Sequence, residues 1–293
     1  MQINAIPDHW PHAAQMRRVQ SRPHDWSVIE AGVEPGRGPT ILMLHGAGGS
    51  GHSFRALIPW LAPQYHLVIP DLPGQGFTRA GNKGRLGLDP MAEDLARLCE
   101  TMAIRPRIIL GHSAGAAIAL RMSETLPVGG VIGLNAALGA FEGAAGVLFP
   151  LLARVLAITP FIPTFVSRLW GNPATVKKLI TSTGSAPDAE GLACYLALVQ
   201  DRDHIDGTLA MMAQWRLDGL LARLPDLQTP TLLIATAGDK AVPARISREA
   251  AARMPDATYL EMEKLGHLAH EEAAERIAGP MLDWLTGRLA ASA

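Results

Sequence analysis

Short apolar runs alternate with longer segments of helical periodicity along most of this 293-residue chain. This alternation is typical of strands that pair in parallel and are joined by helices crossing over the faces of the sheet. Strands are predicted at 41–44, 67–69, 108–110, 131–134, 232–235 and 258–261, and helices at 53–61, 91–102, 114–126, 245–253 and 273–285. A hairpin over about 16–20 and 26–32 adds antiparallel strands at one edge. We therefore expect an α/β fold with a mostly parallel sheet of about eight strands and helices on both faces.

The alternation stops between about 138 and 224, where helical periodicity continues without a clear strand. Within this insert, Pro187 and Asp188 mark a helix start. The sequence contains no internal repeat and no low-complexity linker beside it, so we expect a helical cap that packs on the sheet. The expected organisation is a core formed by 1–137 and 225–293, with a cap over 138–224.

The sequence G-H-S-A-G at 111–115 follows one predicted strand and opens a predicted helix. A serine at the centre of G-x-S-x-G in this context is the signature of a nucleophile on a sharp turn. Such a turn strains the backbone of the serine, and the two glycines remove Cβ atoms that would clash there. Ser113 is therefore the candidate nucleophile, placed at the carboxyl edge of the sheet beside a helix N-terminus.

A serine hydroxyl needs a base that takes its proton and a third group that orients the base. Asp239 follows the predicted strand 232–235, within A-G-D-K-A-V-P, and His267 follows the strand 258–261, within K-L-G-H-L-A-H. Both residues fall at the same edge of the predicted sheet as Ser113. The chain order nucleophile, acid, base is one of the known orders of a catalytic triad. We predict that these three residues form one.

A glycine-rich loop, H-G-A-G-G at 45–49, follows the predicted strand 41–44. Acyl transfer needs hydrogen-bond donors directed at the oxygen that becomes negative, and we assign these to the main-chain amides of Ala47 and Ala114. Glycine loops can also hold phosphate, but the loop lacks G-x-x-x-x-G-K followed by Ser or Thr, and it is not a G-x-G-x-x-G that opens a helix. ATP binding is accordingly disfavoured, and no cofactor is expected.

Several residues close to the predicted triad in the fold are candidate ligand contacts: Gly46, His112, Asn135, Phe149, Met211, Met212 and Trp215. The cluster of two methionines and a tryptophan is either interior packing or the lining of a pocket for a bulky flat ligand, because thioethers suit both. The aromatic residues of the apolar part of the insert leave a similar choice between a lid and a patch at a membrane interface: Phe149, Phe161, Phe165 and Trp170.

Other polar residues near the triad are interpreted as structural. Asp71 begins D-x-P-G-x-G, which is chiefly a turn motif. His267 and His270 do not have the spacing of a known zinc motif, and no third ligand is evident, so no metal site is predicted. We expect His270 and Glu271 to brace the loop that carries His267.

Composition excludes several classes of protein. Lys plus Arg is 26 and Asp plus Glu is 27, so the net charge of −1 lacks the positive excess that nucleic-acid binding needs. Cys99 and Cys194 form no C-x-x-C pair, which indicates a reducing compartment without disulfides. The first twelve residues lack the apolar run of about 7 to 15 residues of a signal peptide, so secretion is not expected. The apolar stretch 147–166 carries three prolines, which favours a lid or a membrane-surface patch over a membrane span.

Five segments together resemble the α/β-hydrolase superfamily over almost the whole chain. They are H-G-A-G-G at 45–49, D-L-P-G-Q-G-F-T at 71–78, G-H-S-A-G at 111–115, G-D-K-A-V-P at 238–243 and G-H-L-A-H-E-E at 266–272. The resemblance implies the α/β-hydrolase fold. Within that superfamily, serine at the nucleophile position excludes the dehalogenase and epoxide-hydrolase branches, which need Asp there.

Further segments are similar to the magnesium-chelatase accessory family of bacteriochlorophyll biosynthesis. They are L-N-A-A-L at 134–138, the proline-rich stretch, S-T-G-S-A-P-D-A-E-G at 182–191 and H-I-D-G-T-L-A-M-M-A-Q-W at 204–215. This resemblance implies a role around magnesium insertion into protoporphyrin IX and an association with magnesium-chelatase subunits. It also implies a location in the cytoplasm, with contact at the inner face of the photosynthetic membrane.

Two functions stay open at this point. One is a serine hydrolase that acts on a hydrophobic acyl substrate. The other is a non-catalytic protein that holds a porphyrin in the same cavity and delivers it. The chain has no Walker motif, so it is not itself an ATP-driven motor for magnesium insertion.

Overall fold

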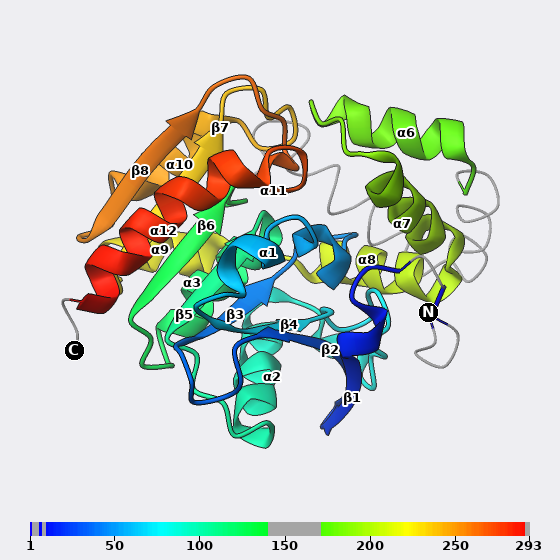
Figure 1. Ribbon diagram of the computed structural model, residues 1–293, viewed down its shortest axis with the longest axis horizontal. Coiled ribbons are helices and arrows are strands. Elements are labelled where there is room, and N and C mark those ends of the chain that lie inside the picture. Colours follow the sequence, from blue (N-terminus) through cyan, green and yellow to red (C-terminus); the bar gives the residue numbers. More distant parts are fainter. Residues whose placement is uncertain (2–5, 8–9, 140–170, 291–293) are drawn as a thin grey trace.

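A central sheet organises the computed structural model, which describes residues 1, 6–7, 10–139 and 171–290 (Figure 1). Its eight strands are β1 (Met16–Ser21), β2 (His24–Gly32), β3 (Thr40–Leu44), β4 (His66–Pro70), β5 (Ile108–His112), β6 (Gly130–Leu134), β7 (Thr231–Thr236) and β8 (Ala257–Met262). Their order in space is β1-β2-β4-β3-β5-β6-β7-β8. β2 pairs antiparallel with β1 and β4, and all other neighbours pair in parallel. The mostly parallel eight-stranded sheet expected from the sequence is confirmed.

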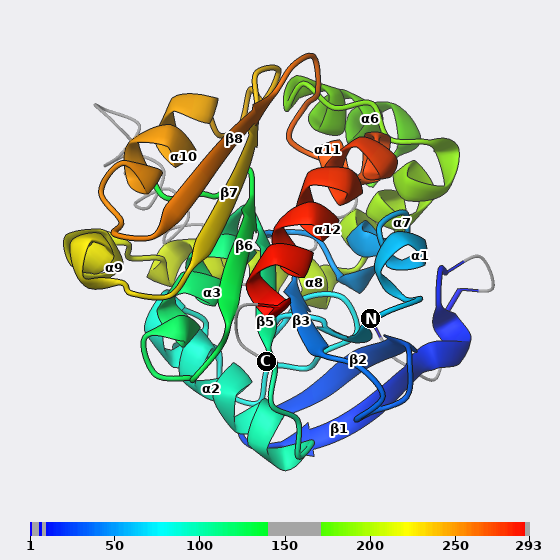
Figure 2. The same cartoon turned by 60° about the vertical axis from the view of Figure 1, so that its left-hand side comes forward.

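Helices cover both faces of this sheet (Figure 2). One face packs against α2 (Leu88–Thr101), α3 (Ala114–Ser123), α9 (Asp218–Arg223) and α10 (Ala244–Ala251). The other packs against α1 (Ile58–Leu61), α11 (Ala269–Glu272) and α12 (Ala274–Ala290). The single helix predicted over 53–61 is instead a 3₁₀ turn, η3 (Gly51–Phe54), followed by α1. Pro59 lies in the first turn of α1, where its missing N–H is tolerated but where it cannot continue a preceding helix.

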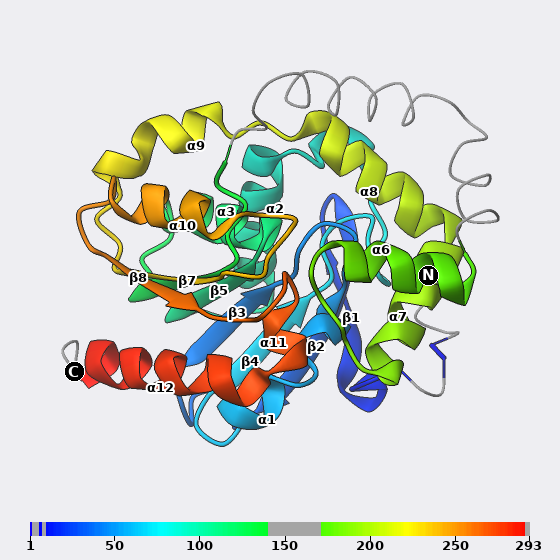
Figure 3. The same ribbon diagram turned by 90° about the horizontal axis from the view of Figure 1, so that it is seen from above.

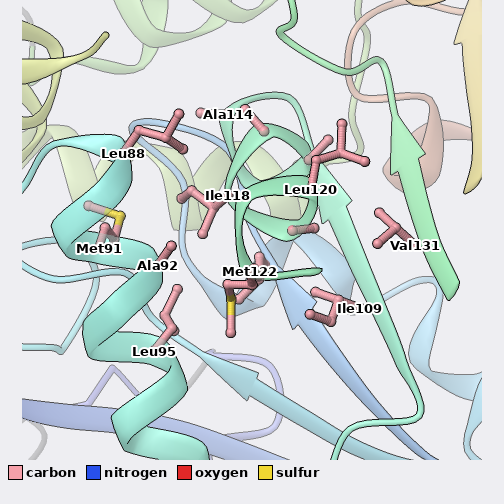
Figure 4. Packing of buried hydrophobic residues seen from close by; sticks show 14 of the residues in the cluster. Leu88, Met91, Ala92, Leu95, Ile109, Ala114, Ile118, Leu120, Met122 and Val131 are labelled. Atoms are coloured by element: carbon pink, nitrogen blue, oxygen red, sulfur yellow. The ribbon is translucent and has the colours of Figure 1, made fainter. Parts of the chain in front are cut away.

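Alternate residues of the central strands pack into opposite layers. Ile108 and Leu110 of β5 belong to the cluster beneath α1 and α12, whereas Ile109 belongs to the cluster beneath α2 and α3. Figure 4 shows this second layer, in which side chains of α2 and α3 pack against Ile109 and against Val131 of β6. Because both faces of these strands are buried, their sequences are nearly continuously apolar.

A helical insertion separates β6 from β7. Before α9 it contains α6 (Pro173–Ser182), α7 (Ala189–Gln200) and α8 (Arg202–Gln214), which gather at one end of the molecule (Figure 3). The helix starts are encoded locally, because Asn172, Asp188 and Asp201 each accept a hydrogen bond from the amide three residues further on. The apolar cluster that joins these helices to the rest of the molecule includes Trp10, Phe77, Cys194, Leu198 and Leu268.

None of the helices within the described residues is long and apolar enough to cross a membrane. The apolar stretch 147–166, for which we predict a lid or a membrane-surface patch, lies outside the described residues.

Candidate active site

Ser113 occupies the turn between β5 and α3 with φ 53° and ψ −116°. A positive φ is strained for a residue that has a Cβ atom. Close backbone packing explains the glycines on either side. A Cβ atom at Gly111 would lie 2.3 Å from the backbone of Gly115, and one at Gly115 would lie 2.1 Å from the carbonyl oxygen of Leu44. The G-x-S-x-G pattern is therefore a steric requirement of a turn that presents Ser113 at the carboxyl edge of the sheet.

His267 and Asp239 are joined by a short hydrogen bond, with Nδ1 of His267 2.6 Å from Oδ2 of Asp239. The other carboxylate oxygen accepts hydrogen bonds from the amides of Ala241 and Val242 at 2.7 and 2.8 Å. Since an ionised carboxylate only accepts, His267 donates from Nδ1, and its Nε2 is left free to take up a proton. His267 and Ser113 line the same two cavities.

The loop that carries His267 is held from the sheet side by side-chain hydrogen bonds. Nδ2 of Asn135, just after β6, donates to the carbonyl oxygens of Gly266 and His267 at 3.2 and 2.9 Å. Oδ1 of Asn135 accepts from the amide of Thr236 at 2.9 Å, and Nε2 of His112 donates to the His267 carbonyl at 3.0 Å. Both ends of the Asn135 amide are already bonded, and this residue lines neither cavity at Ser113.

The loop between α6 and α7 holds both triad loops from the other side. The carbonyl oxygen of Thr183 accepts hydrogen bonds from the amides of Lys240 and His267, at 3.0 and 3.4 Å. Oγ of Ser185 accepts from the amide of Leu268 at 2.8 Å. The helical insertion thus contacts the acid loop and the base loop directly. Sequence reasoning missed both residues. Thr183 acts through its main-chain carbonyl, which has no signature in the sequence, and the partner of Ser185 lies 83 positions away.

The two amides assigned to the oxyanion hole donate to none of the described residues. The carbonyl oxygen of Gly46 accepts from Nδ1 of His45 at 2.8 Å and from the amide of Gly49 at 3.1 Å. In a trans peptide the N–H points opposite to the C=O, so the amide of Ala47 points away from these partners. Ala114 is the first residue of α3, where an amide has no intrahelical acceptor. Neither amide donates to another described residue, and both residues line the smaller cavity.

Several histidines around the site are buried and neutral. Burial lowers the pKa of His45 to about 4 and that of His270 to about 3. Burial also lowers the pKa of His204 to about 3 and holds that of His112 well below its usual value. At neutral pH these four rings therefore add no charge to the site.

A buried ion cluster links α11 to the helical insertion. Glu271 accepts hydrogen bonds from Arg55 at 2.5 Å and from the hydroxyl of Tyr195 at 2.7 Å. Arg55 also forms an ion pair with Asp188, the N-cap residue of α7, at 2.7 Å. Burial raises the pKa of Glu271 to about 7, against the opposing effects of Arg55 and Tyr195. Glu271 follows His267 by four residues, so this cluster fixes the base loop relative to α7.

Two cavities, of about 480 and 250 Å³, share Ala47, Ser113, Met212 and His267. The apolar lining of the larger comes mainly from Val176, Leu179, Ile180, Val199, Ile205 and Leu209 of the insertion. The smaller is lined chiefly by Ala137, Met211, Met212, Trp215, Leu217 and Val242. Among the described residues, no Asp, Glu, Lys or Arg lines either cavity.

The remaining predicted contacts fall in different places. Gly46 and His112 line the larger cavity, Met211 and Trp215 the smaller, and Phe149 lies outside the described residues. Asp71 is buried, and its carboxylate accepts hydrogen bonds from the amides of Gly51 and Phe77, as suits a turn residue. Within the described part of the chain, no three His, Cys, Asp or Glu side chains are grouped so as to hold a metal ion.

The family model of the alpha/beta hydrolase fold matches residues 39–274. The chain is an α/β-hydrolase. This α/β-hydrolase is 47% identical to the magnesium-chelatase 30 kDa subunit of Rhodobacter capsulatus, over 98% of its own length and 100% of that protein. The family and the more particular resemblance seen in the sequence are both confirmed.

Two more distant relatives of the α/β-hydrolase are informative. It is 30% identical to a pimeloyl-acyl-carrier-protein methyl ester esterase of Xanthomonas oryzae pv. oryzae, over 83% of this chain and 93% of that one. An alpha/beta hydrolase fold protein from Burkholderia ambifaria superposes with a TM-score of 0.75 at 21% identity, covering 91% of this chain and 97% of that one. This last likeness shows the fold alone.

Proposed function

We propose that the protein is a serine hydrolase that cleaves an ester or another acyl bond. Ser113 is its nucleophile, His267 its general base and Asp239 the group that orients the base. The observation that carries this proposal is the 2.6 Å bond between Asp239 and His267, together with the two cavities that His267 lines with the strained Ser113. A hydrogen-bonded carboxylate fixes the tautomer of the imidazole and stabilises the charge that the ring acquires.

In the proposed reaction, Nε2 of His267 takes the proton of the Ser113 hydroxyl as the oxygen attacks the acyl carbon. The carbonyl oxygen becomes negative and accepts hydrogen bonds from the amides of Ala47 and Ala114. His267 then gives its proton to the leaving alcohol, and the acyl group remains on Ser113. A water molecule, deprotonated by His267, attacks the acyl carbon in turn. The bond from the acyl carbon to Oγ of Ser113 then breaks, His267 returns its proton to that oxygen, and the acid is released.

The cavities favour an apolar substrate. Their described walls are mainly aliphatic, aromatic and thioether side chains, with a few hydroxyls and with His112 and His204, whose pKa values are lowered by burial. A charged group would lose its hydration there without a counter-charge from these walls. We place Gly46, His112, Phe149, Met211, Met212 and Trp215 among the substrate contacts of this proposal, with 138–224 as the cap and 1–137 and 225–293 as the core.

We also propose that the hydrolase acts in bacteriochlorophyll biosynthesis, close to magnesium insertion into protoporphyrin IX. The support is the 47% identity over full length to the magnesium-chelatase 30 kDa subunit. In this proposal the protein associates with magnesium-chelatase subunits in the cytoplasm, in contact with the inner face of the photosynthetic membrane. Neither a cofactor nor a resident metal takes part in the proposed hydrolysis.

A second candidate function is porphyrin holding without turnover. The observation that favours it is the pair of mainly apolar cavities that share lining residues, one of which is lined by Trp215 and two methionines. A tetrapyrrole bound there would lie close enough to Trp215 to quench its fluorescence. Titration with protoporphyrin IX and with its magnesium complex tests this function, and Trp215→Phe identifies the tryptophan that reports binding. Unchanged emission would remove this candidate.

The serine-hydrolase proposal is tested by labelling the purified full chain with an alkyl fluorophosphonate and by assaying a series of uncharged p-nitrophenyl esters. We expect covalent labelling at Ser113, no labelling of Ser113→Ala, and a kcat for that variant lower by about a million-fold. Full complementation of pigment synthesis by Ser113→Ala in a deletion strain would show that hydrolysis is dispensable in the pathway. Absence of labelling in the wild type would end the proposal.

A further inference from the structure

The loop that carries Ala47 is also held from the helical insertion. Its outer residue is Gly48, which has φ +77° and is fixed through both of its peptide groups. Its N–H donates to Oε1 of Gln75 at 2.7 Å, and its carbonyl oxygen lies 3.2 Å from Nε2 of His204 on α8. Each of the three peptide groups between Gly46 and Gly49 therefore makes at least one hydrogen bond. The carbonyl of Gly48 is the one that is held by a residue of α8.

The hydrogen-bonding role of each ring nitrogen of His204 follows from its partners. Nδ1 lies 3.0 Å from the amide nitrogen of Gly76, which can only donate. Nδ1 is therefore the acceptor, so Nε2 carries the hydrogen and donates it to the carbonyl of Gly48. Burial keeps the ring neutral, with a pKa lowered to about 3. A single neutral imidazole thus joins the 45–49 loop to the turn that contains Gly76.

The approach of α8 to this turn is determined by glycine. A Cβ atom at Gly207 would lie 2.0 Å from the carbonyl oxygen of Gly74, so only glycine permits this contact. His204 is one helical turn before Gly207, and its own amide is capped by Asp201 at 2.8 Å. The close packing and the cap together fix where the imidazole reaches the loop.

We propose that His204 is a positioning residue through which the helical insertion sets the oxyanion donor Ala47. This inference rests on the proposed hydrolase function and deepens it. When α8 is packed on the 74–76 turn, His204 fixes the carbonyl of Gly48. The peptide group that carries the Ala47 N–H lies two peptide groups before this carbonyl, so its position depends on the same contact. The insertion would then contribute to stabilisation of the transition state as well as to the shape of the cavity.

Two substitutions separate the roles of the two ring nitrogens. In His204→Gln, the amide nitrogen can occupy the position of Nε2 and donate to Gly48, while the acceptor for Gly76 is lost. In His204→Asn, the amide oxygen can occupy the position of Nδ1, while the donor to Gly48 is lost. We expect His204→Asn to lower kcat about tenfold with little change in KM, a smaller loss than the roughly 10²- to 10³-fold for a direct oxyanion donor. His204→Gln is expected to retain most of the kcat.

A transition-state analogue provides a second readout. A trifluoromethyl ketone forms an anionic adduct with the serine, whereas the matching methyl ketone is bound uncharged. We expect His204→Asn to lower the affinity for the trifluoromethyl ketone by the same factor as it lowers kcat/KM. The affinity for the methyl ketone should stay unchanged. Asp206→Asn is the control, because Asp206 lies on α8 like His204 and its substitution removes an ion pair with Lys83 outside the 45–49 loop. This control should behave as the wild type.

The outcomes distinguish the inference from the function on which it rests. If the wild type reacts with fluorophosphonate and His204→Asn keeps the wild-type kcat and ketone affinities, the positioning role is wrong and the hydrolase stands. If His204→Asn and Asp206→Asn lose activity equally, the effect is general loosening of the insertion, which also overturns the inference. A wild type that fails to react refutes the hydrolase itself.

Discussion

The two sides of the candidate active site are built by different means. On the nucleophile side, the geometry of Ser113 depends on five consecutive residues, with Gly111 and Gly115 packed against backbone atoms. On the base side, the loop of His267 is held by side chains and carbonyls from β6, β7 and the helical insertion. The first arrangement depends on steric exclusion, within the turn at Gly111 and against the end of β3 at Gly115, and the second on many separate hydrogen bonds. A substitution on the nucleophile side should therefore cause a large loss of stability and activity, whereas a substitution on the base side should cause a partial loss.

The sharpest test of the nucleophile side is Gly115→Ala. The added Cβ atom would lie 2.1 Å from the carbonyl oxygen of Leu44, a backbone atom within the sheet that cannot move cheaply. We expect a loss of at least about 3 kcal/mol in the free energy of unfolding, in the range of severe core substitutions, and loss of esterase activity. Urea denaturation followed by circular dichroism measures the first, and hydrolysis of p-nitrophenyl esters the second.

Gly287→Ala is the matched control. Gly287 lies inside α12, and a Cβ atom added there would meet nothing within 4 Å. Because alanine is the better helix former, we expect an increase in stability of about 0.5 to 1 kcal/mol. Equal effects of the two substitutions would contradict a steric origin for the pattern around Ser113.

On the base side, Asn135→Ala should have a smaller and separable effect. It removes two donors to the carbonyls of Gly266 and His267 and one acceptor for the amide of Thr236. A buried polar group left without a hydrogen-bonding partner costs about 1 to 3 kcal/mol, and we expect the free energy of unfolding to fall by an amount in this range. We also expect kcat to fall about tenfold to a hundredfold because His267 loses its support from β6, with KM nearly unchanged.

A rise in KM with kcat unchanged would instead indicate that Asn135 contacts the substrate, as its sequence position suggested. Steady-state kinetics with two esters of different chain length distinguish these outcomes. A ligand contact should affect the two esters unequally, whereas a displaced base should affect both by the same factor.

The sequence was informative where structure is determined locally. Every predicted strand is present, since short apolar runs bounded by turn residues are sufficient to indicate buried strands. The triad positions followed from G-x-S-x-G and from the loops after the two last strands. The helix predicted over 53–61 was wrong in detail, because Pro59 is tolerated in the first turn of α1 but cannot continue a helix from the preceding 3₁₀ turn.

Sequence reasoning could not find contacts made between distant segments. His204 lies 156 positions from Gly48, and Thr183 binds loops more than 50 positions away through its main chain. Asn135 was identified as a residue of the active edge, but its partners depend on how β6 and β7 align. Polar residues in loops become interpretable only when the fold supplies their neighbours.

The smallest expected effect concerns Glu271, and it tests whether the base side is also sensitive to pH. The pKa of Glu271 is raised to about 7 in the folded protein, against about 4.3 in an unfolded chain. The folded state therefore binds more protons between these pH values, so this residue's contribution to stability falls as pH rises from about 4.3 to about 7. Glu271→Gln lacks this titration. We expect the free energy of unfolding of the wild type, relative to Glu271→Gln, to be lower at pH 8 than at pH 5.

The comparison with Glu271→Gln is needed because buried histidines titrate in the opposite sense. Their lowered pKa values make the unfolded state the better proton acceptor below about pH 6.5, so their contribution to stability is lost as pH falls. That contribution is common to both proteins and cancels in the difference. Tyr195→Phe keeps the carboxyl but removes a hydrogen bond to it, so the pH-dependent difference should persist and extend to higher pH. A difference that is constant from pH 5 to pH 8 would show that Glu271 is ionised throughout, held by Arg55 as a permanent ion pair.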